Sequence, residues 1–287
     1  MTDAKAGTDA TAAPGPPAGA GEPAVRVVEL TKDYPGGVRA LEGVTFDVPA
    51  GELTSLIGPS GCGKTTTLKI VAGLIPATSG QVIVEGRPVT GPGPERAFVF
   101  QDFALLPWAN VLRNVAFGLE MRGVARAERE ATAREFIAKT NLTGFEHHYP
   151  HQLSGGMRQR VGLARALAVD ADILLMDEPF ASVDEQIRRA FQEDLLRLLS
   201  EARKTVLFVT HSIEEAVYVS DQIVILTRGP GRVSNAVRPE IARDGSSDEI
   251  RRSRGYLDAV EEIWGELRGY VEQDMHAVQG PAQGATS

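Results

Sequence analysis

The clearest chemical signature in the sequence is the run Gly58-Pro59-Ser60-Gly61-Cys62-Gly63-Lys64-Thr65, which Thr66 follows. It stands between an apolar, strand-like stretch that ends at Ile57 and a helix-like stretch that ends near Leu74. The three glycines let the backbone curl so that several N–H groups point inward, beside the positive end of the following helix. This context predicts a phosphate-binding loop, in which residues 58 to 66 contact a nucleoside triphosphate. Lys64 would reach the β- and γ-phosphates, and the Thr65 hydroxyl would ligate Mg²⁺.

Two adjacent carboxylates, Asp177 and Glu178, follow the all-apolar stretch from Ile173 to Met176. An all-apolar strand is typical of a parallel sheet that is covered on both faces, and ligands bind at the carboxyl edge of such sheets. We expect Asp177 to hold Mg²⁺ and Glu178 to orient and polarise the attacking water. In isolation, so short a motif could equally be a solvated pair at a strand end. The phosphate-binding loop upstream favours the hydrolytic interpretation.

A second anion site is predicted at Ser154-Gly155-Gly156, within the run from Leu153 to Arg160. Serine is a good N-cap, and glycines allow close backbone approach at a helix N-terminus. In isolation these three residues would indicate only a structural helix cap. The run as a whole, however, resembles the signature motif of the ATPases of ABC transporters, which ordinary phosphate-loop enzymes lack.

The other motifs of that family occur in order between residues 25 and 240. Gln101 resembles the Q-loop glutamine and His211 resembles the switch histidine, each just after a strand-like stretch. Asp184 resembles the D-loop aspartate, although the family usually shows Ala-Leu-Asp where this chain has Ser-Val-Asp. Because the aspartate itself is present, we expect altered packing there rather than lost function. Tyr34 lies where the family carries an aromatic residue that stacks on adenine. The alternative for Tyr34 is a turn residue that shields a sheet edge.

The resemblance implies a mechanism as well as a fold. Glu178 would act in hydrolysis of ATP, with Gln101 and His211 reporting the γ-phosphate. Mg²⁺ would be held by Thr65, Gln101 and Asp177. Two copies would pair head to tail, so that Ser154, Gly155 and Gly156 of one copy contact the ATP on the phosphate-binding loop of the other. Asp184 would carry signals between the two copies.

A finer resemblance is to the importer ATPases for nitrate, sulfonates and taurine. It rests on Gly91 to Arg96, Phe100-Gln101, Leu105 to Trp108, Asn114-Val115, Pro150 to Leu153 and Glu178-Pro179-Phe180. Ser212 departs from the aspartate that usually follows the switch histidine. The resemblance implies that membrane permease subunits are direct partners, with the apolar segment from Leu105 to Trp108 facing them, and that an extracytoplasmic solute-binding protein is an indirect partner. The alternatives are an ABC exporter ATPase and a soluble ABC ATPase outside transport.

The resemblance also implies an α/β fold, with a P-loop NTPase core of ABC type, an antiparallel β subdomain and a helical subdomain. We expect disordered tails at 1–24 and 273–287, an ATPase domain at 25–247 with its helical subdomain at about 102–165, and a C-terminal helix at 248–272. The C-terminal helix has the apolar set Ile250, Leu257, Val260, Ile263, Trp264 and Leu267. Such a stripe is more typical of a helix docked on its own domain than of a partner site.

Within the ATPase domain, Val25 to Leu30 and Val38 to Val48 predict a small antiparallel sheet before the phosphate-binding loop. Strands and helices then alternate, which predicts a parallel sheet. The predicted strands are Gln81–Glu85, Ala97–Phe100, Ile173–Met176, Val206–Val209, Ile223–Leu226 and Arg232–Val237. The predicted helices include Asp184–Arg203, Ile213–Val219 and Arg126–Lys139, the last with Ala127, Ala131, Phe136 and Ile137 on its apolar side.

The bulk properties fit this assignment. A formal net charge of −8 over 287 residues argues against a nucleic-acid partner, whose binding surfaces need clustered Lys and Arg. No apolar run is long enough to span a bilayer. Because the resemblance implies a membrane partner, we expect a peripheral protein at the cytoplasmic face of the cell membrane.

Cys62, the one cysteine of the chain, lies inside the phosphate-binding loop. It is better explained as a tolerated loop residue than as a catalytic one. Its place near a helix N-terminus nevertheless predicts a lowered thiol pKa. The hypothesis is that alkylation of Cys62 blocks ATP hydrolysis and that bound ATP protects the thiol.

Overall fold

The computed structural model describes residues 22–181 and 185–278. Its first sheet is antiparallel and contains β1 (Val25–Tyr34), β2 (Val38–Val48), β4 (Ser79–Val84) and β5 (Arg87–Pro88), in the order β2-β1-β4-β5. Valines and leucines alternate with polar residues along β1 and β2, and one side of each strand is buried. The predicted antiparallel sheet is therefore present, with β1 continuing to Tyr34.

The second sheet has the order β10-β9-β3-β8-β7-β6. All neighbouring strands in it are parallel except β10 and β9, which pair antiparallel. Every residue of β3, β7 and β8 is buried, as is typical of predominantly apolar strands in a sheet covered on both faces. The strands of this sheet are β3 (Leu53–Ile57), β6 (Arg96–Val99), β7 (Ile173–Asp177), β8 (Thr205–Val209), β9 (Gln222–Leu226) and β10 (Val233–Val237).

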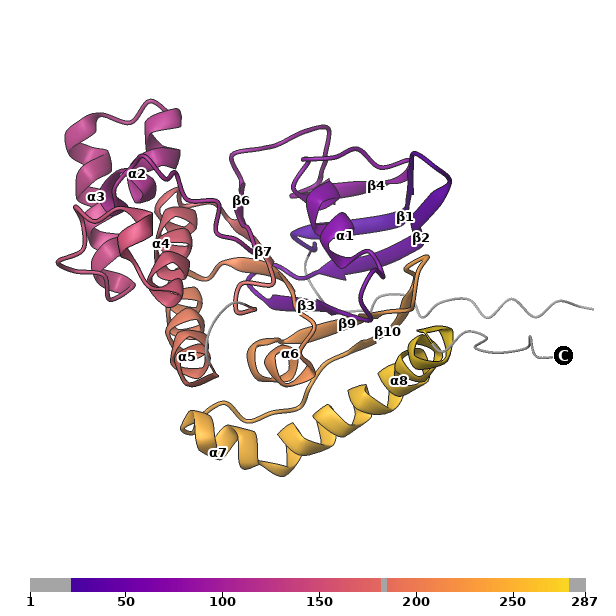
Figure 1. Ribbon diagram of the computed structural model, residues 1–287. Coiled ribbons are helices and arrows are strands. Elements are labelled where there is room, and N and C mark those ends of the chain that lie inside the picture. The colour runs from indigo at the N-terminus through magenta and orange to yellow at the C-terminus, as the bar shows by residue number, and fades with distance from the viewer. Residues whose placement is uncertain (1–21, 182–184, 279–287) are drawn as a thin grey trace, which may run out of the picture.

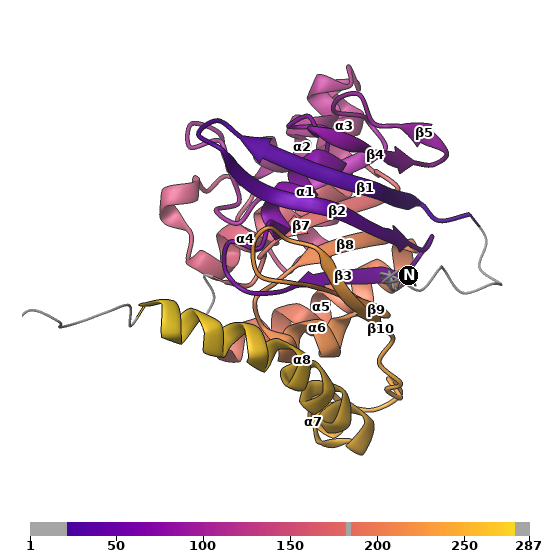
Figure 2. The ribbon, with the colours of Figure 1, turned by 90° about the vertical axis from the view of Figure 1, so that its right-hand side faces the viewer.

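Helices cover both faces of the second sheet (Figures 1 and 2). α1 (Lys64–Val71) lies between the two sheets, and an apolar core joins it to residues of both. The opposite face packs on α5 (Glu185–Ala202) and α6 (Ile213–Val219) through a second core. The structure thus has the predicted α/β architecture.

A group of helices stands to one side of the sheets in Figure 1. It comprises α2 (Val111–Met121), α3 (Arg126–Lys139), the short 3₁₀ helix η1 (Pro150–Gln152) and α4 (Gly155–Ala168). These elements enclose a core of their own. The predicted apolar side of α3 is wrong in part, because Ala127 and Ala131 are exposed while Ala133 and Ile137 are buried. Alanine carries little apolar surface, so the larger Ile137 sets which side of the helix faces the core.

The C-terminal region differs from the single helix predicted at 248–272. It forms α7 (Ser247–Arg252) and α8 (Arg254–Val278), separated at Ser253. Ser253 has extended backbone angles (φ −65°, ψ 148°), and its hydroxyl accepts a hydrogen bond from the Tyr256 N–H at 3.3 Å. One serine therefore ends α7 and caps α8. α8 continues to Val278, into the predicted tail, since no Gly or Pro occurs between Gly269 and Gly280.

Most of the predicted apolar stripe of this region does dock on the domain. Ile250, Ile263 and Leu267 are buried in the core beneath the second sheet, whereas Leu257 and Trp264 are exposed. None of the helices within residues 22–181 and 185–278 combines the length and the apolar character needed to cross a membrane.

Candidate functional site

Four neighbouring parallel strands bring the predicted site residues to one edge of the second sheet. β3, β8, β7 and β6 lie side by side in that order, so their carboxyl ends are together. β3 ends at the phosphate-binding loop, β6 leads to Gln101, β7 to Asp177 and Glu178, and β8 to His211. Residues more than a hundred positions apart thus meet because the strands run parallel.

The phosphate-binding loop follows a backbone path that requires glycine. Gly58, Gly61 and Gly63 have φ values of +154°, +76° and +95°. A Cβ at Gly63 would lie 2.3 Å from a Leu41 methyl carbon, whereas a Cβ at Gly61 would meet nothing within 4 Å. The loop is therefore packed tightly on the β2 side and open at Gly61, where a ligand can approach its backbone.

Lys64 and Thr65 begin α1 at the end of this loop. The Lys64 side chain is buried, and its ammonium donates to the carbonyl oxygens of Gly58 (2.7 Å) and Pro59 (3.1 Å). The ammonium thus lies within the curl of the loop, as a phosphate-binding lysine requires. The hydroxyls of Thr66 and Tyr34 are 3.3 Å apart, so the exposed Tyr34 ring stands beside the start of α1.

The Thr65 hydroxyl donates to Oδ1 of Asp177 at 2.9 Å. Asp177 is buried, which raises the pKa of its carboxyl group, and the hydrogen bond from Thr65 acts in the opposite direction. A hydroxyl and a carboxylate oxygen side by side are the ligand types that Mg²⁺ prefers. These two residues therefore fit a Mg²⁺ site. Gln101, the third predicted ligand, points its amide instead at Glu178.

Glu178 is the point where the predicted catalytic side chains meet. Its Oε2 lies 3.4 Å from Nε2 of Gln101 and 3.3 Å from Nδ1 of His211. Glu178 has a left-handed backbone (φ 46°), held by a hydrogen bond from its N–H to the Val209 carbonyl. A non-glycine residue in that region is uncommon, and such residues occur frequently at functional sites. The geometry thus places a carboxylate, an amide and an imidazole within reach of one water molecule.

Ser154 caps α4, since its hydroxyl accepts a hydrogen bond from the Met157 N–H at 3.3 Å. Gly155 and Gly156 form the first turn of that helix. α4 packs against α2, α3 and β6, and Figure 1 shows it within the side group of helices, apart from α1. The predicted second anion site is therefore not beside Lys64 of the same chain.

Two further positions bear on the predicted motifs. Asp184, with Ser182 and Val183, lies outside the residues that the structure describes. Ser212 is the N-cap of α6, and its hydroxyl accepts a hydrogen bond from the Glu215 N–H at 3.2 Å. Serine and aspartate are both good N-caps, so serine in place of the family's aspartate at position 212 still caps α6.

The predicted lowering of the Cys62 thiol pKa is wrong. The side chain is completely buried, and burial raises the pKa of its thiol, outweighing the nearby Lys64 ammonium that acts to lower it. Its position near a helix N-terminus does not offset the loss of solvation.

We therefore expect Cys62 to resist alkylation in the folded protein. Iodoacetamide at neutral pH should modify it at least about 10-fold more slowly than in concentrated urea, because the thiolate is both buried and scarce. Mass spectrometry gives an unambiguous readout, since the chain has one cysteine. Equal rates with and without urea would contradict the buried, protonated thiol.

Sequence reasoning missed Arg165, which lies on α4 and holds the segment after Gln101. Its guanidinium donates to the carbonyls of Ala104 (2.8 Å) and Phe103 (2.6 Å). Both of those residues have left-handed backbones, with φ values of 61° for Phe103 and 41° for Ala104. The available signal was that Arg165 is the one charged residue between Val161 and Ala168 of α4, because a guanidinium among small and apolar residues needs acceptors.

Comparison with known proteins supplies independent evidence. Residues 41–181 match the family model described as ABC transporter. An uncharacterized ABC transporter ATP-binding protein of Methanocaldococcus jannaschii is 49% identical over 76% of this chain and 83% of its own length. A taurine import ATP-binding protein of Chromobacterium violaceum is 50% identical over 77% of this chain and 85% of its own length. A dimeric ATP-binding cassette bound to ADP and phosphate, solved in a post-hydrolysis state, aligns with a TM-score of 0.67 and 33% identity over 75% of this chain and 98% of its own.

Proposed function

This chain belongs to the family of ABC transporter ATP-binding proteins, and on that premise we propose that it is the ATP-hydrolysing subunit of an importer for taurine-like sulfonates or related small solutes. The observation that carries the proposal is the convergence of Gln101 and His211 on Glu178, at the sheet edge that also holds the phosphate-binding loop. The similarity to taurine import proteins favours import over export.

ATP would bind with its phosphates in the loop from Gly58 to Lys64 and its adenine against Tyr34. Thr65 and Asp177 would hold Mg²⁺, which would neutralise charge on the phosphate oxygens. Glu178 would orient the attacking water and polarise it, because phosphoryl transfer needs mainly positioning and charge stabilisation. Gln101 and His211 would fix the Glu178 carboxylate through the contacts that join them.

The site would be completed by a second copy of the chain. α4 lies apart from α1, and this separation supports a role in which Ser154, Gly155 and Gly156 would serve another chain rather than their own. The helix N-terminus that they form suits an anion such as a terminal phosphate. Head-to-tail pairing would give each ATP a phosphate-binding loop from one copy and a capped helix from the other, and Asp184 would carry signals between the two copies.

The membrane partner would be a permease, with the chain held at the cytoplasmic face of the membrane. Between α2 and α3 the structure has a groove of about 660 Å³. Trp108 stands at this groove and is 70% exposed, which is unusual for so large an apolar side chain. We assign this surface to a cytoplasmic segment of the permease. A solute-binding protein outside the membrane would deliver the solute.

The test is uptake into proteoliposomes that contain this chain with a permease and a solute-binding protein of a taurine import system. ATP inside the vesicles should drive accumulation of labelled taurine or another sulfonate. Trp108→Ala should reduce this uptake by at least about 10-fold, as loss of a central interface aromatic does, and leave ATP hydrolysis by the isolated subunit unchanged. ATP-driven release of solute in place of uptake, or full uptake with Trp108→Ala, would contradict the assignment.

A further inference from the structure

The turn that joins β9 to β10, residues 228–231, runs along one flank of the phosphate-binding loop. The carbonyl of Leu226, just before the turn, closely faces Gly58, where a Cβ would lie 2.7 Å from the oxygen. A Cβ at Gly229 would lie 3.4 Å from the Gly61 carbonyl oxygen. At Gly231 the approach is closest, because a Cβ there would lie only 2.0 Å from the carbonyl oxygen of Cys62. The loop therefore rests on the end of β9 at Leu226 and on the turn at Gly229 and Gly231.

Gly231 is also fixed from the other side, by β2. Its N–H donates to the Ala40 carbonyl and its carbonyl accepts from the Glu42 N–H, each at 2.9 Å. The hydroxyl of Thr227 accepts a hydrogen bond from the Arg232 N–H at 3.1 Å and closes the turn. Backbone contacts thus hold Gly231 between the antiparallel sheet and the phosphate-binding loop.

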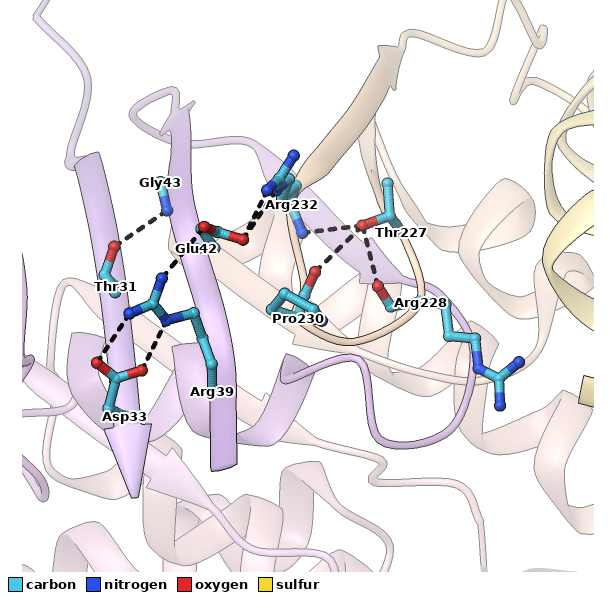
Figure 3. A network of polar contacts seen from close by, with 9 residues as sticks. All are labelled: Thr31, Asp33, Arg39, Glu42, Gly43, Thr227, Arg228, Pro230 and Arg232. Carbon is cyan, nitrogen blue, oxygen red and sulfur yellow. Dashed lines mark hydrogen bonds and ion pairs between the residues drawn. The ribbon is translucent and has the colours of Figure 1, made fainter. Parts of the chain in front are cut away.

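Side chains extend this connection across the surface, as Figure 3 shows. Arg232 donates to Glu42 at 2.6 Å, and this contact holds the pKa of Glu42 below its ordinary value. Arg39 joins Glu42 at 3.2 Å to Asp33 at 2.8 Å. Asp33 directly precedes Tyr34, the candidate adenine contact, in β1. A continuous chain of contacts therefore leads from the turn to the residue beside Tyr34.

The contact at Cys62 has a direct consequence for phosphate binding. In a planar trans peptide the C=O and N–H bonds point in opposite directions. Because the Cys62 carbonyl points at Gly231, the N–H of Gly63 in the same peptide points away from the turn. Displacing the carbonyl would rotate that N–H, and the N–H groups of such a loop are what cradle the phosphates.

We propose that the 228–231 turn is a positioning element for ATP, in which Gly231 sets the orientation of the Cys62–Gly63 peptide and the Arg232–Glu42 pair couples the phosphate-binding loop to the sheet that carries Tyr34. This role rests on the ATP site described under the proposed function. It assigns to Gly231 and Arg232 an effect on nucleotide affinity that acts through other residues.

The primary test is the Kd for ATP of the full chain, measured by titration calorimetry, with Gly231→Ala compared with Gly229→Ala. The methyl group at residue 231 must displace the Cys62 carbonyl by about 1 Å, and misplacement on that scale can lower binding or rate by up to about 100-fold. For Gly231→Ala we expect Kd and KM to rise at least about 10-fold, while kcat at saturating ATP stays within about threefold of wild type. For Gly229→Ala we expect these constants to stay within about twofold of wild type. Unchanged Kd in folded Gly231→Ala protein would overturn the proposal, as would a lower kcat at wild-type KM.

A second set of variants keeps the test decisive if Gly231→Ala does not fold. Arg232→Ala and Glu42→Ala should each raise KM by about two- to fivefold. The double variant should raise KM no further than Glu42→Ala alone, since the Arg232–Glu42 pair is lost in all three and Glu42→Ala also removes the contact with Arg39. Arg126→Ala, which removes the exposed Arg126–Glu130 pair on α3, is the matched control and should leave KM unchanged. A wild-type protein that binds no ATP would refute the ATP site itself, whereas variants that bind as wild type does would refute only the role of the turn.

Discussion

Glu178→Gln is expected to lower the rate of ATP hydrolysis by about 100- to 1,000-fold while ATP still binds. The amide keeps the shape of the side chain but removes the charge that polarises water. Lys64, Thr65 and Asp177 are unchanged, so the phosphates and Mg²⁺ keep their contacts. Because hydrolysis is then too slow to separate the two copies, the variant should accumulate as an ATP-bound dimer. Phosphate release and size-exclusion chromatography with ATP measure the two effects.

Glu85→Gln is the matched control for this experiment. Glu85 also has a left-handed backbone (φ 47°), but it is exposed in the turn after β4, which belongs to the other sheet. It should retain wild-type hydrolysis. A Glu178→Gln protein that is monomeric with ATP and fully active would exclude Glu178 as the catalytic carboxylate.

Ser154→Arg should abolish hydrolysis and ATP-dependent dimer formation, but not binding of ATP to the isolated chain. The substitution places a bulky side chain at the N-terminus of α4, where the partner's phosphate would bind, and leaves the phosphate-binding loop intact. Lys64→Ala should instead weaken ATP binding itself, by about 100-fold, because it removes the buried ammonium that we propose as a phosphate contact. Calorimetry separates the two variants, and chromatography with ATP reports the dimer.

Ser246→Arg makes the same change at another helix N-cap, that of α7, where Ser246 accepts a hydrogen bond from the Glu249 N–H. Losing a cap lowers stability by about 1 kcal/mol in either helix, so this variant controls for the structural effect. If Ser154→Arg hydrolysed ATP as Ser246→Arg does, the shared site would be refuted.

Much of this fold could be predicted because the pattern of apolar residues in the sequence agrees with the burial of those residues in the structure. The run from Ile173 to Met176 is apolar throughout, which indicates a strand covered on both faces, and β7 is buried at every residue. α6 has the predicted bounds, Ile213–Val219, and α3 the predicted bounds, Arg126–Lys139. For the site, the resemblance to ABC transporter ATPases singled out Gln101, Glu178 and His211, and the parallel strands that precede them account for their meeting at one sheet edge.

Features that depend on contacts between distant segments could not be predicted. The burial of Cys62 comes from the tight packing of the whole loop, not from the adjacent helix N-terminus. The break at Ser253 depends on a cap that competes with continuation of the helix, and helix propensity alone does not decide between them. The Gly-Pro-Gly sequence at 229–231 indicates a turn, but nothing local shows that Gly231 touches Cys62 across 169 positions (231 − 62).

The docking of α7 and α8 links the end of the chain to the catalytic edge. Ile250, Tyr256 and Ile263 share one continuous core with Leu174 and Phe208, which lie in the strands that carry Asp177 and precede His211. Segments packed into one core often belong to one cooperative unfolding unit, so we expect the C-terminal helices to unfold together with the strands that lead to the nucleotide site. A bound nucleotide would therefore raise the stability of helices that it never contacts, and any loss of burial at the C-terminus would lower the population of chains able to bind it.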